Sequence, residues 1–347
     1  MKYRAEIDGL RALAVLPVIL FHAGFEWFSG GFVGVDVFFV ISGYLITTVL
    51  LEDMEKGRFS IVDFYDRRAR RLLPALFFIM LLTSLFSLMY LPPHALKDVG
   101  QSIVAVSLFL SNIFFFIEVD YFANTAELAP LLHTWSLGVE EQFYILFPFL
   151  LLALKNKSTD FRSLIMLSLL VTSLLLSEFI VHKDSQFSFF MPFTRFWELA
   201  AGSMIALNRR QLDVLESSLT HNLLAALGII LIFIPILFYT KSTLFPGFTA
   251  LVPVVGTVLV IAFANQSTFV ARMLSCRILV SLGLLSYSLY LSHNVVFALS
   301  RNIGIPLSSI SIQIALIFIS LFVAMASYFF VEKPLRHIKA SKSVYLA

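Results

Sequence analysis

Long apolar runs alternate with short polar segments along the chain, from Leu10 to Val331. Each run is about 20 residues long, the length at which an α-helix crosses a hydrocarbon core about 30 Å thick. The alternation predicts an all-α fold, a polytopic transmembrane helical bundle of about ten spanning helices. We expect these helices at 10–28, 32–51, 72–91, 135–154, 163–181, 189–207, 222–240, 247–264, 278–299 and 308–331.

One further apolar segment, 101–117, is shorter and carries Ser107, Ser111 and Asn112. Lys and Arg residues near helix ends favour the cytoplasm. If this segment does not cross and the N-terminus lies inside, most of the 25 basic residues fall in cytoplasmic segments, whereas a crossing removes that bias. We therefore predict cytoplasmic termini and a segment 101–117 that is re-entrant or lies in the outer interface, where it would line a cavity.

Composition agrees with a membrane location. The chain is 59% hydrophobic and 14% charged, whereas soluble domains have ~45–50% apolar and ~25% charged residues. Its one cysteine, Cys276, excludes an internal disulfide and a zinc site with several cysteines. We expect a single membrane domain over 1–347 that contacts lipids, with no nucleic-acid partner, no metal and no permanently bound cofactor.

The first predicted helix carries two ionisable residues, and such groups inside a bilayer are costly enough to be candidate functional residues. Arg11 and His22 are eleven positions apart, which places them within about 20° of one face and about 16 Å apart along the helix axis. They would face the same interior, although Pro17 could kink the helix between them. The alternative is a histidine that is merely satisfied by a neighbouring carbonyl.

Three carboxylates also lie within predicted helices. Asp36 follows the glycine-rich start of the second helix, and Glu140 and Glu141 lie about two turns into the helix at 135–154. Glu140 comes seven residues after His133, on nearly the same face, and is the stronger candidate. Glu141 could instead lie at the membrane interface.

Two weaker clusters have structural explanations as well. Arg195 and Glu198 are spaced i, i+3 and could pair for structural reasons alone. Tyr290 and His293 bring polar groups to the helix at 278–299, which the aromatic belts of membrane proteins explain in part.

Four arginines, at 67, 68, 70 and 71, precede the apolar run at 72–91. Such a cluster at a cytoplasmic helix start could simply fix the topology. The functional alternative is a phosphate clamp, because guanidinium groups bind phosphates through two hydrogen bonds. Arg68 and Arg71 are one helical turn apart and would share a face.

Seven segments, in this order, resemble the acyltransferase-3 family of membrane acyltransferases. They are Glu6–Arg11 with its spacing to His22, Gly34–Tyr44, the arginines before Pro74, His133–Tyr144, Arg195–Leu199, Tyr287–His293 and Glu332–Arg336. The resemblance implies O-acylation of extracytoplasmic glycans at a bacterial inner membrane, with acetyl-CoA as the usual donor. It also implies that Arg11, His22, Arg68 and Arg71 are important. Many members continue into an extra helix and an extracytoplasmic esterase-like domain, so we expect a stand-alone member or a shortened chain.

Our hypothesis is that an acetyl group moves from cytoplasmic acetyl-CoA to a hydroxyl of an extracytoplasmic or lipid-linked polysaccharide, such as an O-antigen or exopolysaccharide. His22 would act as general base, with Glu140 or Asp36 orienting its imidazole. Direct transfer and a covalent relay are both compatible with the sequence. We assign Arg11, Arg67, Arg68 and Arg71 to the coenzyme A phosphates, and His133, Trp135, Glu141, Tyr144, Arg195, Glu198, Tyr290 and His293 to the acceptor.

Two other classes of protein share this pattern. A transporter or a flippase of a lipid-linked glycan would also be polytopic with buried charges, but transporters often contain inverted repeats, which we do not find. A non-catalytic membrane partner of another enzyme would have little reason to retain several unpaired intramembrane charges.

Overall fold

The computed structural model describes residues 3–119, 121–122, 124–209 and 218–336, and it is helical throughout, with no strand among these residues. Lys2, Arg210, Lys339 and Lys342, which contribute to the predicted charge bias, lie outside them. The α-helices are α1 (Ala5–Ala23), α2 (Gly34–Glu55), α3 (Ile61–Tyr90), α4 (Pro93–Ser107), α5 (Ser111–Glu118), α6 (Trp135–Ala153), α7 (Thr159–Val181), α8 (Ser185–Phe190), α9 (Pro192–Leu207), α11 (Ser218–Phe238), α12 (Leu251–Phe263), α13 (Phe269–Leu274), α14 (Arg277–Asn302), α15 (Ile310–Ala326) and α16 (Lys333–Arg336).

Short 3-10 helices complete the described chain: η1 (Glu26–Phe28), η2 (Gly31–Val33), η3 (Asn124–Leu128), η4 (Leu132–Thr134) and η5 (Gly247–Ala250). One segment, η6 (Ser327–Glu332), is a π-helix between α15 and α16. π-Helical turns are rare and occur often at functional sites.

The all-α, polytopic bundle is confirmed, but the count of ten spanning helices is not. By length and composition, seven helices of the described chain can cross a membrane: 31–55, 61–90, 132–153, 159–181, 219–238, 277–302 and 310–336. The helix α1 carries Glu6, Asp8 and Arg11, and α9 has only 16 residues. The apolar stretch Gly247–Phe263 is likewise shorter than the others.

The segment 101–117 is two helices rather than one. The helix α4 ends at Ser107, α5 begins at Ser111, and Phe109 in the turn between them has a positive φ of 55°. The Phe109 carbonyl accepts a hydrogen bond from Gln142 on α6, 2.9 Å away. The segment therefore does not form one continuous span, and its predicted re-entrant position in the bilayer stays a prediction.

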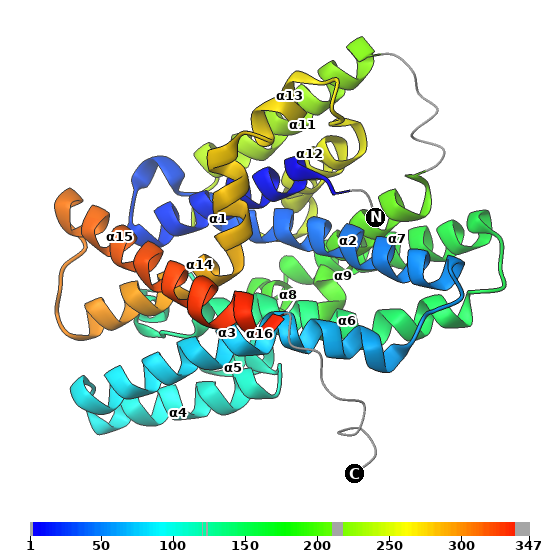
Figure 1. Ribbon diagram of the computed structural model, residues 1–347. Coiled ribbons are helices and arrows are strands. Elements are labelled where there is room, and N and C mark those ends of the chain that lie inside the picture. The colour runs from blue at the N-terminus through cyan, green and yellow to red at the C-terminus, as the bar shows by residue number, and fades with distance from the viewer. Residues whose placement is uncertain (1–2, 120, 123, 210–217, 337–347) are drawn as a thin grey trace.

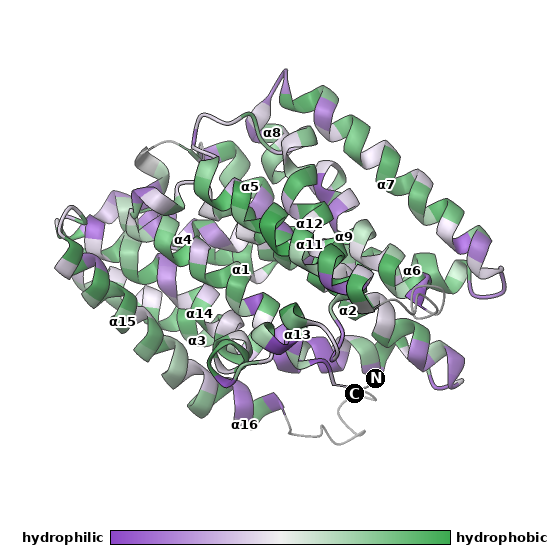
Figure 2. Ribbon diagram, turned by 90° about the horizontal axis from the view of Figure 1, so that it is seen from above, coloured by the Kyte–Doolittle hydropathy of each residue, from purple (hydrophilic) through white to green (hydrophobic). Residues whose placement is uncertain are grey.

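The helices α1 and α2 form the interior of the bundle. The helix α1 packs mainly on α14 and α2, and α2 packs mainly on α9, while α3 and α4 lie side by side along one edge (Figure 1). Hydrophobic residues run along most of each helix and hydrophilic ones gather at helix ends and loops (Figure 2). Large apolar side chains such as Leu88, Met89 and Phe322 are exposed on the outside, as expected when lipid is the solvent.

Two glycines permit the close crossing of α2 and α9. A Cβ at Gly43 would lie 1.9 Å from the Leu199 carbonyl oxygen, and one at Gly202 would lie 2.0 Å from the Val40 carbonyl oxygen. Small residues of this kind let helix backbones approach each other inside membranes. The approach matters for function because α2 supplies one wall of the cavity described below.

The α2–α9 crossing can be tested with a matched pair of alanine substitutions. Gly43→Ala should destabilise the fold by about 1–3 kcal/mol, because the new methyl group overlaps a backbone carbonyl that cannot rotate away. Gly100→Ala is the control, since a Cβ there has no neighbour within 4 Å. Melting temperatures of the purified variants in detergent measure the difference. Equal melting temperatures would contradict the close crossing.

Candidate active site

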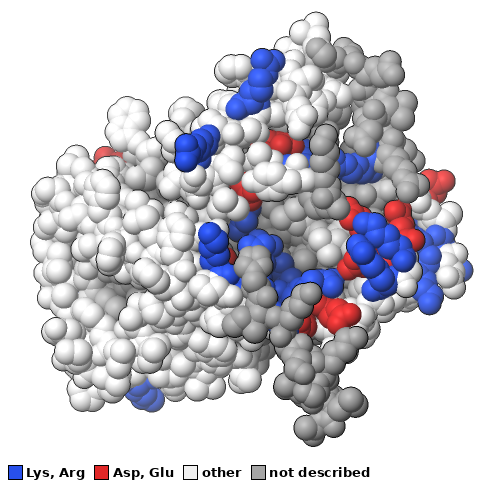
Figure 3. Space-filling view, viewed as in Figure 1, with Lys and Arg blue, Asp and Glu red and all other residues white. Residues whose placement is uncertain are grey.

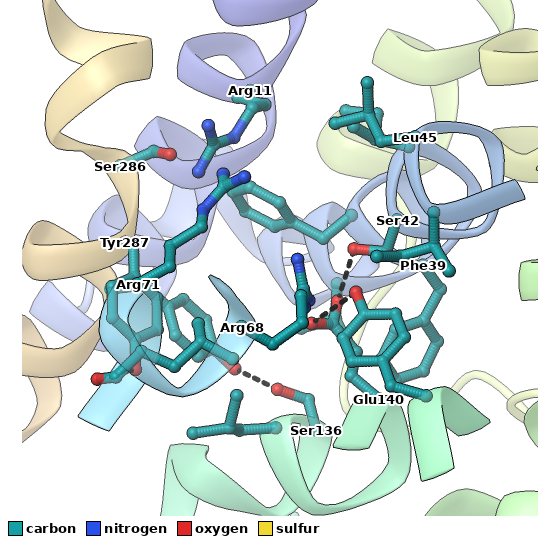
Figure 4. Close-up of a pocket in the computed structure, with 18 of the residues that line it drawn as sticks. Arg11, Phe39, Ser42, Leu45, Arg68, Arg71, Ser136, Glu140, Ser286 and Tyr287 are labelled. Carbon is teal, nitrogen blue, oxygen red and sulfur yellow. Dashed lines mark hydrogen bonds between the residues drawn. The ribbon is translucent and has the colours of Figure 1, made fainter. Parts of the chain in front are cut away.

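A cavity opens between α1, α2, α3, α6 and α14, and the empty space in it and in front of it, open solvent included, is about 800 Å³. Basic side chains gather around a hollow in the face of the molecule seen in Figure 3. Arg11, Arg68 and Arg71 line the cavity and reach into it from α1 and α3 (Figure 4). We call it the arginine cavity.

The arginines are rigidly presented because α3 begins earlier than the apolar run. The Ser60 hydroxyl caps the helix by accepting a hydrogen bond from the Asp63 amide, so 61–71 is helical. Arg68 and Arg71 therefore share a face, as predicted. The Arg68 guanidinium lies 4.0 Å from the centre of the Tyr144 ring and 3.8 Å from Glu141.

The other arginines of the cluster point elsewhere. Arg67 forms a 2.8 Å ion pair with Asp53, and half of its side chain is exposed. Arg70 pairs with Asp66 on its own helix. Among the four clustered arginines, only Arg68 and Arg71 line the arginine cavity, so Arg67 lies outside the site to which the sequence assigned it.

Glu140 lies in the wall of the arginine cavity. Its carboxylate accepts hydrogen bonds from the Ser42 hydroxyl at 2.8 Å and from the Tyr144 hydroxyl at 3.4 Å. Glu141 faces Arg68 rather than the membrane interface. Neither carboxylate contacts His22, so the structure does not support Glu140 as the group that orients that imidazole.

His22 is not part of the arginine cavity's wall, although Arg11 on the same helix is. Its Nδ1 lies 2.8 Å from the Val18 carbonyl oxygen. A carbonyl only accepts, so Nδ1 carries the proton and Nε2 presents a free lone pair. The carbonyl partner foreseen as the alternative interpretation is therefore present, and it leaves Nε2 available as a base.

Three histidines meet beside the arginine cavity, on α1, η4 and α14. The ring of His22 lies 5.1 Å from that of His293, which lies 5.4 Å from that of His133. We call these three residues the histidine cluster. Tyr290 contacts both His133 and His293, and it also lines the arginine cavity. The cluster and the arginine cavity are thus neighbours separated by one side chain.

Tyr290 is fixed from both sides. Its hydroxyl donates to the His133 carbonyl at 2.9 Å and lies 2.8 Å from the Ser136 hydroxyl. In Figure 4 the Ser136 contact is drawn as a dashed line at the floor of the cavity. The aromatic residue expected to contact the acceptor therefore lies between the arginine cavity and the histidine cluster.

Asp36, Arg195 and Glu198 form a separate ion-pair cluster that is fully buried. Arg195 lies 3.1 Å from Asp36 and 3.0 Å from Glu198. Four aromatic rings surround its guanidinium at 5.4–5.7 Å: Phe39, Trp135, Phe189 and Phe245. Asp36 therefore pairs with Arg195 rather than His22, and this pair ties α2 to α9, while the i, i+3 pair of Arg195 and Glu198 lies within α9.

A charged network lies over the C-terminal end of α1. Arg301 donates to the His22 carbonyl oxygen at 2.8 Å and pairs with Glu127 at 3.2 Å. Lys241 binds the same carboxylate at 2.8 Å. Burial raises the pKa of Glu127, but the hydrogen bond from Lys241 and the charge of Arg301 outweigh it, so the pKa lies below its usual value. Glu127 is therefore ionised at neutral pH and holds both cations in place.

Several residues of the site were not predicted. Ser42, Ser136 and Ser286 line the arginine cavity, and Arg301 holds the end of α1. Serines in helices carry no distinctive pattern, because they also serve helix packing. Arg301 was not among the predicted site residues, because its partners, His22 and Glu127, lie in distant segments of the sequence.

The comparisons agree with this architecture. The sequence model of the acyltransferase domain (Acyl_transf_3) matches residues 4–329, so the chain belongs to the acyltransferase-3 family, as the seven segments predicted. It is 32% identical to the peptidoglycan O-acetyltransferase OatA of Listeria monocytogenes over 96% of this chain and 56% of that protein. No solved structure matches the chain.

Two further relatives have the same coverage pattern. The chain is 34% identical to the putative peptidoglycan O-acetyltransferase YrhL of Bacillus subtilis, over 96% of this chain and 55% of that protein. It is 33% identical to the O-acetyltransferase OatA of Staphylococcus aureus, over 96% and 57% respectively. The chain thus spans about half the length of the curated relatives it matches.

The buried ion-pair cluster predicts a strong asymmetry between two substitutions. Arg195→Met should cost about 3–5 kcal/mol of stability, because it leaves two buried carboxylates without a cation. Asp36→Asn should be much milder, since Arg195 keeps Glu198. Thermal unfolding of both variants in detergent measures this order. If Asp36→Asn were instead stable but inactive in acetyl transfer, the structural role assigned to Asp36 would be incomplete.

Proposed function

We propose that this chain is a membrane O-acetyltransferase that moves an acetyl group from acetyl-CoA, bound in the arginine cavity, to a hydroxyl of a glycan outside the membrane. The observation that supports the proposal is the adjacency of the arginine cavity and the histidine cluster inside an apolar bundle. The cavity is lined by Arg11, Arg68 and Arg71, and Tyr290 both lines it and contacts the histidine cluster. The names of the relatives, O-acetyltransferases that include two of peptidoglycan, support the reaction class.

The donor is inferred from charge. Coenzyme A carries a diphosphate and a 3′-phosphate, and arginine is the side chain best suited to bind phosphate oxygens through two hydrogen bonds. Ser286 adds a buried hydroxyl without a hydrogen-bond partner among the described residues. An anionic ligand would accept a hydrogen bond from this hydroxyl and would also compensate the charges of the guanidinium groups. We place the phosphates here and the thioester toward Tyr290.

His22 is the base in this proposal. The Val18 carbonyl holds its tautomer, so that Nε2 can take the proton of the acceptor hydroxyl. That carbonyl does the orienting that we first expected of Glu140 or Asp36. The alkoxide oxygen then attacks the thioester carbon, and coenzyme A leaves as the thiol.

The acceptor is a glycan that reaches His22 from the outer side. We place both termini in the cytoplasm of a bacterial plasma membrane, so α1 runs outward from Arg11 to the half-buried His22. The names of two relatives favour peptidoglycan over the O-antigen or exopolysaccharide suggested by the sequence. A lipid-linked precursor of either glycan would present the same hydroxyl groups.

Transport of a lipid-linked glycan is the competing function. Consumption of acetyl-CoA distinguishes acetyl transfer from transport. Membranes that contain the protein and a glycan acceptor should release free thiol and yield acetylated glycan. A protein that moves glycan without releasing thiol would be a transporter.

The proposed acetyl-CoA site can be tested with alanine substitutions in the arginine cluster, in which Arg67 is the control. Arg68→Ala and Arg71→Ala should raise the KM for acetyl-CoA about 10–100-fold, as expected when hydrogen bonds between charged groups are lost. Arg67→Ala removes an equal charge from the same cytoplasmic cluster but from a half-exposed surface pair, so its KM should stay at the wild-type value. Equal effects of all three would favour a topology anchor instead of a phosphate clamp.

His22→Ala should abolish acetyl transfer while the protein still inserts and binds acetyl-CoA. General base catalysis contributes about 10²–10⁴-fold to rate, so residual transfer should be at most about one per cent. The checks are O-acetyl content of the glycan by NMR and acetyl-CoA binding by calorimetry. Normal acetylation by this variant would exclude the proposed base.

A further inference from the structure

The histidine cluster contains more titratable groups than the proposed reaction uses. His133 and His293 are about as buried as any side chain in the bundle, with 1% and 0% exposure. Neither ring nitrogen of His133 has a hydrogen-bond partner among the described residues, and neither does Nε2 of His293. Buried polar atoms without partners are rare and costly, so each needs an explanation.

The backbone fixes the tautomer of His293 as it fixes that of His22. Nδ1 of His293 lies 2.6 Å from the Tyr290 carbonyl oxygen. Because a carbonyl only accepts, this Nδ1 carries the proton and Nε2 is a bare acceptor. Two neighbouring imidazoles, with ring centres 5.1 Å apart, thus both present a lone pair at Nε2. As neutral groups they cannot hydrogen-bond to each other at these atoms, and His293 Nε2 makes no hydrogen bond to any described residue. One added proton would join the two acceptors by a hydrogen bond once the rings turn their Nε2 atoms toward each other.

We propose that His293 is the proton-sharing partner of His22: the proton that His22 takes from the acceptor hydroxyl is held between the two imidazoles until coenzyme A leaves. The inference rests on the proposed function and assigns to His293 a role distinct from the acceptor contact expected from the sequence. His133, packed against His293 and Tyr290, is the next group toward the arginine cavity.

The reaction balances with this proton path. The acceptor oxygen forms a bond to the acetyl carbon, and the carbon–sulfur bond of the thioester breaks. The hydroxyl proton passes to His22 Nε2, is shared with His293, and protonates the leaving thiolate. Products are the acetyl ester and the coenzyme A thiol, and both histidines return to their neutral tautomers.

The charged groups near the pair lie at its His22 end. His22 on α1 faces Arg301 on α14, and beyond it Glu127 on η3 and Lys241. His293 faces His133, which follows η3 on η4, and Tyr290 on its own helix. The helix α15, which also packs on α14, contributes no titratable residue. A change in acid sensitivity on substituting His293 would therefore report on this pair.

The test is the pH dependence of acetyl transfer by His293→Gln. Glutamine can still donate to the Tyr290 carbonyl but cannot accept a proton. A proton shared by two imidazoles is held more tightly than by one, so the wild type should lose activity at a higher pH than the variant. We expect the acid limb of kcat/KM to move about one pH unit lower, with kcat reduced about 10–100-fold and the KM for acetyl-CoA unchanged.

Ser292→Ala is the matched control. Ser292 is equally buried on the preceding position of α14, and its hydroxyl donates to backbone carbonyls, so its loss should leave the acid limb in place. An unmoved limb in His293→Gln overturns the proposal. A limb that moves to higher pH also overturns it, because it would mean that a separately protonated His293 had repelled the proton on His22.

A second measurement needs only the wild type and so does not depend on the folding of a variant. In nitrogen-15 NMR spectra of histidine-labelled wild type, acidification should shift the Nε2 signals of His22 and His293 together, with one common midpoint; two separate midpoints would overturn the shared proton. Absence of any thiol release by the wild type would contradict the proposed function itself, which is a different result from two separate midpoints.

Discussion

Every charge in this bundle has to be compensated inside a medium that cannot solvate it, and this constraint organises the molecule. Arg195 satisfies it with two carboxylates and an aromatic shell, so α2 and α9 are locked together. A common cavity is lined by Arg11, Arg68 and Arg71 and by one carboxylate, Glu140, so arginines outnumber carboxylates in its wall. This difference in charge compensation distinguishes the structural Arg195 cluster from the proposed binding site more clearly than charge or burial alone.

Which charged partners could be predicted from the sequence depended on whether they lie on the same helix. Spacing along one helix places Arg68 and Arg71 on a shared face, and it pairs Arg195 with Glu198, because both relations are local. Asp36 was assigned to His22 only because both were intramembrane and unexplained. Its partner lies on α9, at a distance in sequence that no periodicity can bridge. Local geometry was predictable, whereas the choice among distant partners was not.

In the fold, too, local features were predictable from the sequence and features that depend on distant contacts were not. Apolar length identified an all-α membrane bundle, but length alone does not decide how α1 or α9 sit in a bilayer, because α1 carries charges and α9 is short. The segment 101–117 has the composition of a short span and is broken at Phe109, where α5 and α6 exchange contacts through Gln142. The break coincides with tertiary hydrogen bonds from Gln142, which the sequence of the segment itself does not reveal.

Arg11 and His22 lie in different surroundings although they share one helix. Both lie on α1, yet only Arg11 lines the arginine cavity, because Tyr290 and His293 on α14 stand between the cavity and the imidazole of His22. In the proposed reaction, a donor held by its phosphates and an acceptor approaching from outside would therefore meet where α14 contacts α1. That meeting place would be about one side chain thick, so the bundle could bring two substrates together from opposite sides without opening a continuous aqueous path.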